Sequence, residues 1–154
     1  MKKKRLKKKI PTPNPAQDQD AVRLQFSFKH LDADHPRFRM NDCSQEFLRT
    51  LLLQIKIYSE YTEEQFTDEN NDDRRHKNFW ADTSEPDGFT HLGVEMQNEY
   101  SWQFALNSPY DKDSWRVHGM LVDNIFYVVW LDPDHALGAQ KSRNAPTLRS
   151  NKTA

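Results

Sequence analysis

Cysteine, glycine and long apolar runs are scarce in this chain. Cys43 is the single cysteine among 154 residues, so neither an internal disulfide nor a CxxC metal site is available. With four glycines there is no phosphate-binding glycine loop. No apolar stretch approaches the length that spans a bilayer, and the basic amino terminus runs into Pro11-Thr-Pro-Asn-Pro15 rather than into the apolar segment of a secretory signal. We therefore expect a cytoplasmic protein with no membrane partner, a small buried Cys43 thiol, and no cofactor.

The net charge of −1 conceals a strong asymmetry. Residues 1–10 contain seven Lys/Arg and no acid, and residues 139–154 contain four and no acid. That leaves 11 basic residues against all 23 acidic ones between 11 and 138. The central part is therefore acidic, whereas a nucleic-acid-binding protein usually has a basic folded surface.

The two ends have the composition of disordered tails. Residues 1–20 combine a lysine run, alternating prolines and Gln-Asp-Gln-Asp, with no apolar surface to bury, and 139–154 lacks periodicity. We expect one domain over 21–138. The lysine run is interpreted either as a nucleic-acid-binding element or as a solubilising tail. Its basic residues are Lys2, Lys3, Lys4, Arg5, Lys7, Lys8 and Lys9.

Hydrophobic periodicity predicts an α+β fold, with one or two N-terminal helices packed on a mainly antiparallel sheet that ends in a β-hairpin. Residues 44–60 predict the main helix, with an apolar stripe made of Phe47, Leu48, Leu51, Leu52, Ile55 and Tyr58. Thr62-Glu-Glu-Gln65 predicts a capping box that opens a second, short helix. Strands are expected at 22–28, 78–81, 102–106 and in the hairpin at 115–132.

The hairpin is expected to turn at Asp123-Asn124, two residues that tolerate positive φ. This turn pairs Val122 with Ile125, Met120 with Tyr127, His118 with Val129 and Arg116 with Leu131. Because side chains alternate along a strand, one face is predicted to be core. That face consists of Val117, Leu121, Phe126, Val128 and Trp130.

The other face of the hairpin gathers Arg116, His118 and Tyr127. A histidine can transfer protons at neutral pH, an arginine can stabilise a phosphorane, and a tyrosine can orient either. Together they would suit RNA cleavage by the 2′-hydroxyl without a metal. The alternative is structural, with a hydrogen-bonded histidine and the stem of Arg116 lying over Tyr127.

A short internal repeat offers a second chemical hypothesis. Leu31-Asp-Ala-Asp-His35 and Leu131-Asp-Pro-Asp-His135 share one pattern, and each follows a predicted strand. If those strands are parallel neighbours, the carboxylates and imidazoles meet at one sheet edge, where Asp32, His35, Asp132 and His135 would be metal ligands. The alternative, which we favour, is that these residues only end strands and make turns.

The segment from Arg116-Val-His-Gly119 through Phe126-Tyr-Val-Val-Trp-Leu-Asp-Pro-Asp-His135, together with Lys29-His-Leu-Asp32 and His35-Pro-Arg-Phe38, resembles a family of small prokaryotic proteins. The layout of helices followed by a sheet and an arginine-bearing hairpin resembles the RelE/ParE toxin superfamily. That resemblance implies a compact α+β fold and cleavage of mRNA at the ribosome, with Arg116, His118 and Tyr127 as the catalytic positions.

Two functions follow from these patterns. The first is a toxin-like endoribonuclease of RelE-like type, with RNA or the ribosome as substrate and a protein such as an antitoxin as partner. The second is a non-enzymatic interaction module or adaptor of a mobile element, which binds protein through its acidic body and nucleic acid through its basic tails. The nuclease requires Arg116 and His118 to be open to solvent, whereas the module leaves them buried or flat.

Overall fold

In a computed structural model, the described residues are 21–68, 70, 74–93, 100–107 and 115–139. The predicted tail at 1–20, with the seven basic residues of the lysine run, and residues 140–154 of the predicted tail at 139–154 lie outside these ranges. Ala139, the first residue of the second tail, ends a 3₁₀ turn instead. No helix among the described residues is both long enough and apolar enough to cross a bilayer.

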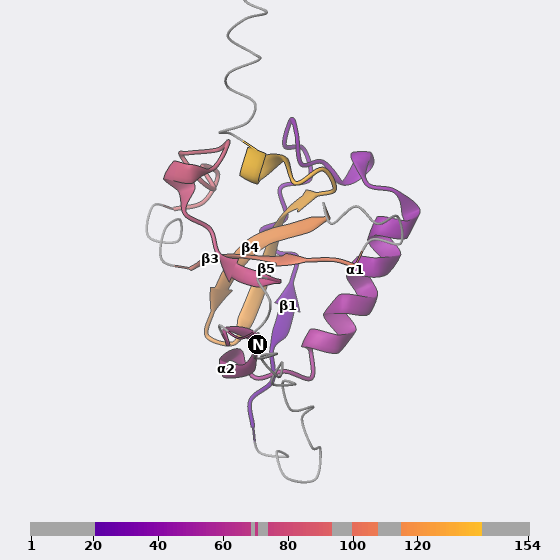
Figure 1. Cartoon of the computed structure of the whole chain (residues 1–154), viewed down its shortest axis with the longest axis vertical. Helices are drawn as coiled ribbons and strands as arrows, with labels where there is room; N and C mark the ends of the chain where they lie inside the picture. Colours follow the sequence, from indigo (N-terminus) through magenta and orange to yellow (C-terminus); the bar gives the residue numbers. More distant parts are fainter. Residues whose placement is uncertain (1–20, 69, 71–73, 94–99, 108–114, 140–154) are drawn as a thin grey trace, which may run out of the picture.

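Five strands form one sheet in the spatial order β1-β5-β4-β3-β2 (Figure 1). The first strand runs parallel to the last, and every other neighbouring pair is antiparallel. The strands are β1 (Gln25–Ser27), β2 (Arg75–Lys77), β3 (Ser101–Ala105), β4 (Arg116–Val122) and β5 (Ile125–Asp132). This arrangement confirms the predicted α+β fold with a mainly antiparallel sheet.

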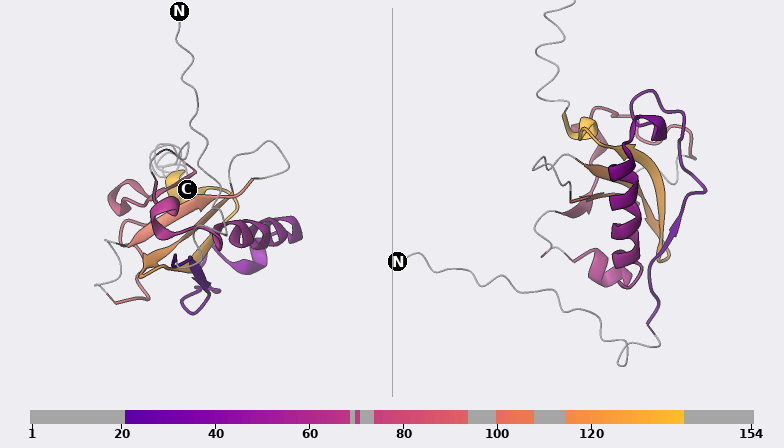
Figure 2. Two further views of the ribbon diagram at one scale, coloured as in Figure 1. Left: turned by 90° about the horizontal axis from the view of Figure 1, so that it is seen from below. Right: turned by 90° about the vertical axis from the view of Figure 1, so that its right-hand side faces the viewer.

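Both predicted helices are present, and their ends are capped as expected. Helix α1 spans Gln45–Tyr58, and the Ser44 side chain at its N-cap accepts a hydrogen bond from the Phe47 amide. Helix α2 spans Glu63–Phe66 and begins with a complete capping box made by Thr62 and Gln65. Seen from the side, α1 lies along one face of the sheet (Figure 2).

The strand predicted at 78–81 is wrong. The pairing strand is β2, three residues earlier, and Trp80–Asp82 forms a 3₁₀ turn in which Trp80 is buried. The sequence gives β2 no apolar pattern because its inward side chain is Arg75. That guanidinium is buried over three aromatic rings, and its Nε donates to the Phe66 carbonyl at 2.7 Å.

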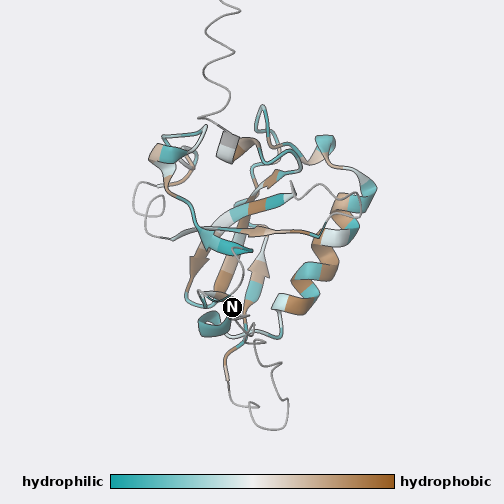
Figure 3. Ribbon diagram, viewed as in Figure 1, coloured by the Kyte–Doolittle hydropathy of each residue, from teal (hydrophilic) through white to brown (hydrophobic). Residues whose placement is uncertain are grey.

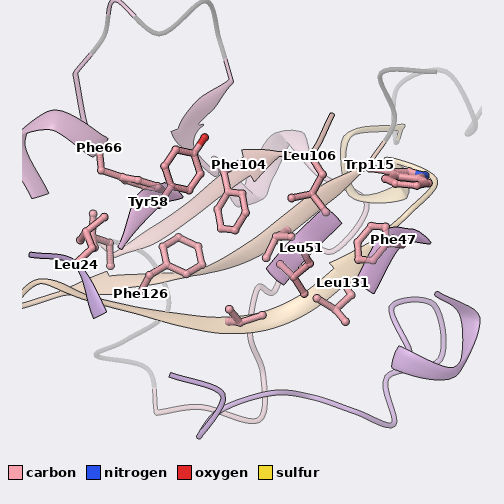
Figure 4. Close-up of a cluster of buried hydrophobic side chains, with 13 residues drawn as sticks. Leu24, Phe47, Leu51, Tyr58, Phe66, Phe104, Leu106, Trp115, Phe126 and Leu131 are labelled. Atoms are coloured by element: carbon pink, nitrogen blue, oxygen red, sulfur yellow. The ribbon is translucent and has the colours of Figure 1, made fainter. Parts of the chain in front are cut away.

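The sheet has a hydrophobic core on each face. The first core lies between the sheet and the helices, where Phe126 and Phe104 pack with α1 and α2 (Figure 4). The second core covers the opposite face with loops and short 3₁₀ turns instead of α-helices. Its buried members are Phe38, Trp80, Phe89, Met120, Val129, Trp130, Ala136 and Leu137.

A β-bulge in the hairpin explains how Trp130 reaches the second core. Asp123 and Asn124 both have positive φ, so the predicted turn is confirmed, as are the pairs Val122–Ile125 and Met120–Tyr127. Between His118 and Gly119 the register then shifts by one residue.

Past the bulge the predicted pairing is wrong by one residue. His118 pairs with Trp130 and Arg116 pairs with Asp132, leaving Val129 as the extra residue of β5. The shift turns Trp130 away from Phe126 and onto the second face, so its predicted place in the first core is wrong. Leu131 lies in the first core instead.

Candidate functional site

The candidate catalytic residues lie on the second face of the sheet, the one opposite α1. Register places Gln103 of β3, His118 of β4 and Trp130 of β5 side by side across this face. Arg116 lies two residues before His118, opposite Asp132. Arg116 and His118 therefore share one face of the hairpin, as predicted, but loops cover this face.

His118 and Asp132 form a fully buried pair. The distance from His118 Nε2 to Asp132 Oδ2 is 2.9 Å, and the exposed fractions of the two side chains are 0% and 1%. Asp132 also accepts hydrogen bonds from the backbone amides of Ala136 at 2.8 Å and Leu137 at 3.1 Å. The carboxylate thus ties the middle of the sheet to the 3₁₀ turn η4 (Ala136–Ala139).

These contacts keep Asp132 ionised. Burial alone raises the pKa of a carboxyl group, but the hydrogen bond from His118 and the amides of Leu137 and Ala136 outweigh it, so the pKa of Asp132 lies below its ordinary value. An ionised carboxylate only accepts hydrogen bonds, so His118 Nε2 carries the donated proton. Both carboxylate oxygens of Asp132 thus already accept hydrogen bonds from within the protein.

A row of buried polar side chains continues from His118 across the sheet. Gln103 Nε2 donates to Asn78 Oδ1 at 2.8 Å, and Asn78 Nδ2 donates to Ser101 Oγ at 3.0 Å. At the His118 end, two buried atoms, Gln103 Oε1 and His118 Nδ1, have no hydrogen-bond partner within the described part of the chain. Gln103 and His118 are directly paired, so both atoms belong to the same stretch of the second face.

The structure separates Tyr127 from the other two predicted catalytic residues. Arg116 pairs with Asp132, whereas Tyr127 pairs with Met120, five positions away along β5. At about 3.3 Å per residue this separation is roughly 16 Å. Tyr127 instead packs against the imidazole of His30, with ring centroids 5.1 Å apart. The structural alternative that placed the Arg116 stem over Tyr127 is wrong for the same reason.

Each Leu-Asp-x-Asp-His segment comes at or after the end of one of two parallel neighbouring strands, β1 and β5, but the two segments are offset along the strand direction. The Asp32 amide donates to the Val129 carbonyl at 3.0 Å, and Asp32 Oδ2 accepts from the Trp130 indole at 3.1 Å. Asp32 is therefore level with the end of the bulge, whereas Asp132 lies further along and is bound to His118. Among the described residues no group of three or more His, Cys, Asp or Glu side chains is placed to hold a metal ion.

His135 is the second histidine near Arg116. It is only partly buried, its backbone has a positive φ of 52°, and its ring packs so closely on Gly138 that a Cβ there would lie 2.8 Å from Nε2. Burial and then the charge of Arg116 lower the pKa of His135, so its imidazole is neutral at pH 7. The sequence singled out His135 only as an alternative metal ligand.

Cys43 is half-buried, and so more accessible than the buried thiol that was predicted. Its Sγ lies 3.7 Å from the Arg39 carbonyl, and burial, together with nearby carboxylates, raises the pKa of its thiol to about 11. A thiol with this pKa stays protonated at neutral pH and is a poor nucleophile.

The outer surface of α1 is the feature that the sequence interpretation missed. Leu52, Leu53 and Ile57 are 62%, 45% and 49% exposed, although Leu52 was predicted to belong to the core stripe.

A shallow groove of about 360 Å³ runs along one side of the helix, lined by Glu46, Arg49, Thr50, Leu53, Gln54, Ile57 and Asn107. Figure 3 shows apolar and polar residues alternating along this exposed helix. A signal was present, since apolar residues occupy almost the whole circumference of α1 and one core can bury only one side.

Comparison with known proteins adds no constraint on these sites. No family model matches the chain, and neither the curated proteins nor the solved structures contain a match. The resemblance to the RelE/ParE superfamily therefore stays a prediction, and any function has to be inferred from the residues themselves.

Proposed function

We propose that this chain is a non-enzymatic interaction module of the cytoplasm, which binds a protein partner through the groove along one side of α1 and not through Leu52. The observation that carries the proposal is the groove beside Leu53 and Ile57, whose side chains are about half exposed. Burying apolar side chains of this kind on binding contributes about 25 cal/mol per Å² removed from water.

The state of His118 supports the same proposal. A general acid or base must come within hydrogen-bond reach of its substrate. His118 is 0% exposed, and its Nε2 already binds Asp132. Burial and pairing of this kind are the properties of a histidine that stabilises a fold, as the module requires of His118, whereas Arg116 is only partly buried.

Comparative co-purification tests the module. The tagged full chain, its Leu53→Glu and Ile57→Glu variants, and a Leu52→Glu control are produced in the source cells, and co-purifying proteins are quantified. Leu52 is the matched control because it is at least as exposed as Leu53 but does not line the groove. We expect a partner protein whose recovered amount falls roughly tenfold with either groove variant and is unchanged with the control. A protein set that is the same for all four chains would refute the proposal.

A second function, metal-independent cleavage of RNA, is favoured by His135. A neutral imidazole that feels the charge of Arg116 could accept the proton of a 2′-hydroxyl as its oxygen attacks the adjacent phosphorus. Arg116 would stabilise the phosphorane, the bond from phosphorus to the 5′-oxygen would break, and the imidazolium would return the proton to that oxygen, leaving a 2′,3′-cyclic phosphate. In this scheme His118 positions the site through Asp132 and does not transfer protons. This is the activity that the resemblance to RelE-like toxins implies, with RNA or the ribosome approached through the lysine run.

Expression separates the two functions. If the second is right, the chain slows growth and cuts mRNA, and Arg116→Ala and His135→Gln each relieve both effects while the purified variants remain folded. A folded, non-toxic chain that leaves RNA intact would refute the second function and leave the module.

A further inference from the structure

The groove residues of α1 follow the spacing of a helix–helix contact stripe. Counting along the helix, Glu46, Thr50, Leu53 and Ile57 succeed one another at intervals of four, three and four residues. This is the spacing at which side chains of one helix meet a second helix packed along it. All four residues line the same groove.

Two cations border this stripe. Arg49 and Lys56 lie seven residues apart, on the flank of the stripe away from the sheet, and both are exposed. Neither makes an ion pair with a carboxylate of the described residues. The opposite flank carries the uncharged Gln54, whose side chain is half-buried. One edge of the groove is therefore cationic, and the single carboxylate of the lining, Glu46, lies at the N-terminal end of the stripe itself.

This charge pattern disfavours a second copy of the chain as the occupant. Two copies related by a twofold axis use the same surface. If their α1 helices are antiparallel, the Arg49 and Lys56 edges face each other, and like charges repel. If the helices are parallel, each cationic edge meets the uncharged Gln54 edge. Glu46 is the one carboxylate of the lining, so each copy brings one carboxylate against the two cations Arg49 and Lys56, and neither arrangement neutralises the cationic edge.

We propose that the groove binds an amphipathic helix of a different protein, with apolar side chains along the contact stripe and Asp or Glu along the edge that meets Arg49 and Lys56. The proposal rests on the function inferred above and specifies the chemistry of the partner. Apolar side chains of the ligand would fill the space beside Leu53 and Ile57. Its carboxylates would supply the ion pairs that select partner and orientation.

Two designed peptides test this chemistry. Each has about 21 residues, long enough to hold a helix, with leucine along one stripe. One peptide has glutamate on both edges of that stripe and the other has lysine. Binding to the full chain is followed by fluorescence anisotropy. We expect the glutamate peptide to bind at least roughly tenfold more tightly than the lysine peptide, and its affinity to fall as salt is raised.

The variants locate the binding. Leu53→Glu should weaken binding of the glutamate peptide roughly tenfold. Arg49→Glu should abolish the difference in affinity between the glutamate and lysine peptides. Leu52→Glu should change neither the affinity nor that difference. Equal affinity for the two peptides, no binding, or equal effects of Leu52→Glu and Leu53→Glu would overturn the proposal. A dimer of the full chain that Leu53→Glu dissociates would overturn it in favour of a second copy. If peptide binding fails while co-purification still depends on Leu53, the partner's chemistry is wrong and the interaction module stands.

Discussion

The imidazole of His118 donates from Nε2 to Asp132 Oδ2, 2.9 Å away, in the middle of the sheet, and neither side chain reaches solvent. The same carboxylate holds the amides of Ala136 and Leu137. One buried charge thereby joins β4, β5 and the 3₁₀ turn η4. A role in stability follows directly from this arrangement.

Removing that carboxylate should destabilise the fold strongly. Asp132→Ala leaves His118 Nε2 and two amides without their acceptor, so we expect a loss of about 3 kcal/mol in the free energy of unfolding, measured with urea. Asp134→Asn is the matched control, because Asp134 is exposed and only two residues away, and it should stay within about 0.5 kcal/mol of the parent. Similar losses for both variants would contradict this role.

Gly119, at the bulge, has no room for a side chain. A Cβ there would lie 2.0 Å from the Tyr127 carbonyl oxygen and 2.6 Å from the Phe126 ring. Gly119→Ala should therefore cost at least about 2 kcal/mol, because backbone has to move. At Gly93 no atom of the described residues lies within 4 Å of an added Cβ, so Gly93→Ala should remain within about 1 kcal/mol of the parent. A tolerated Gly119→Ala would show that the two strands do not approach this closely.

Trp130 should be among the most costly residues to truncate. It is 1% exposed and packs against Phe38, Trp80 and Phe89. Trp130→Ala should lower the free energy of unfolding by about 3–5 kcal/mol. Phe79→Ala serves as the comparison, because Phe79 is 69% exposed and should have little effect. A small loss at Trp130 would mean that the loops do not seal the second core.

Acid should weaken the fold before its carboxylates titrate. Burial lowers the pKa of His35 and His135 below the ordinary value of 6.5, so the unfolded chain binds these protons more tightly than the folded chain. The stability that these two histidines contribute to the folded chain is fully present above about pH 6.5 and is lost as the pH falls below that value. Unfolding in urea at about pH 7.5 and about pH 5.5 should show lower stability at the acid pH. The His35→Gln, His135→Gln double variant should show a smaller difference, and equal or greater stability of the parent at the acid pH would contradict the account.

Local sequence signals predicted the fold well where one residue type has one strong preference. Ser44 and Thr62 mark helix starts because their side chains accept amide protons, and Asp123-Asn124 marks the turn because both residues adopt positive φ. The bulge was not predictable, since the extra Val129 is an ordinary strand residue and only packing on both faces makes the shift favourable. One inserted residue then moved Trp130 to the opposite face.

The candidate site was harder to predict than the fold. A sheet face with Arg116 and His118 is predicted from the sequence to be open and polar. The loops that bury His118 come from segments far away in the chain, and their packing leaves no periodic pattern in the sequence. On α1, the predicted apolar stripe was too wide for one core, because successive residues lie about 100° apart around a helix and Leu52 therefore projects well away from the buried Leu51. Leu52 was misplaced for this reason.

Site-specific photo-crosslinking in the source cells tests the interaction module most directly. A photoreactive residue is placed at Leu53 in the groove, at Leu52 on the neighbouring side of α1, or at His76, an exposed residue on the second face of the sheet. The account predicts a protein adduct from position 53 and none from 52 or 76. The absence of an adduct at 53, or adducts with protein or RNA confined to position 76, would contradict it.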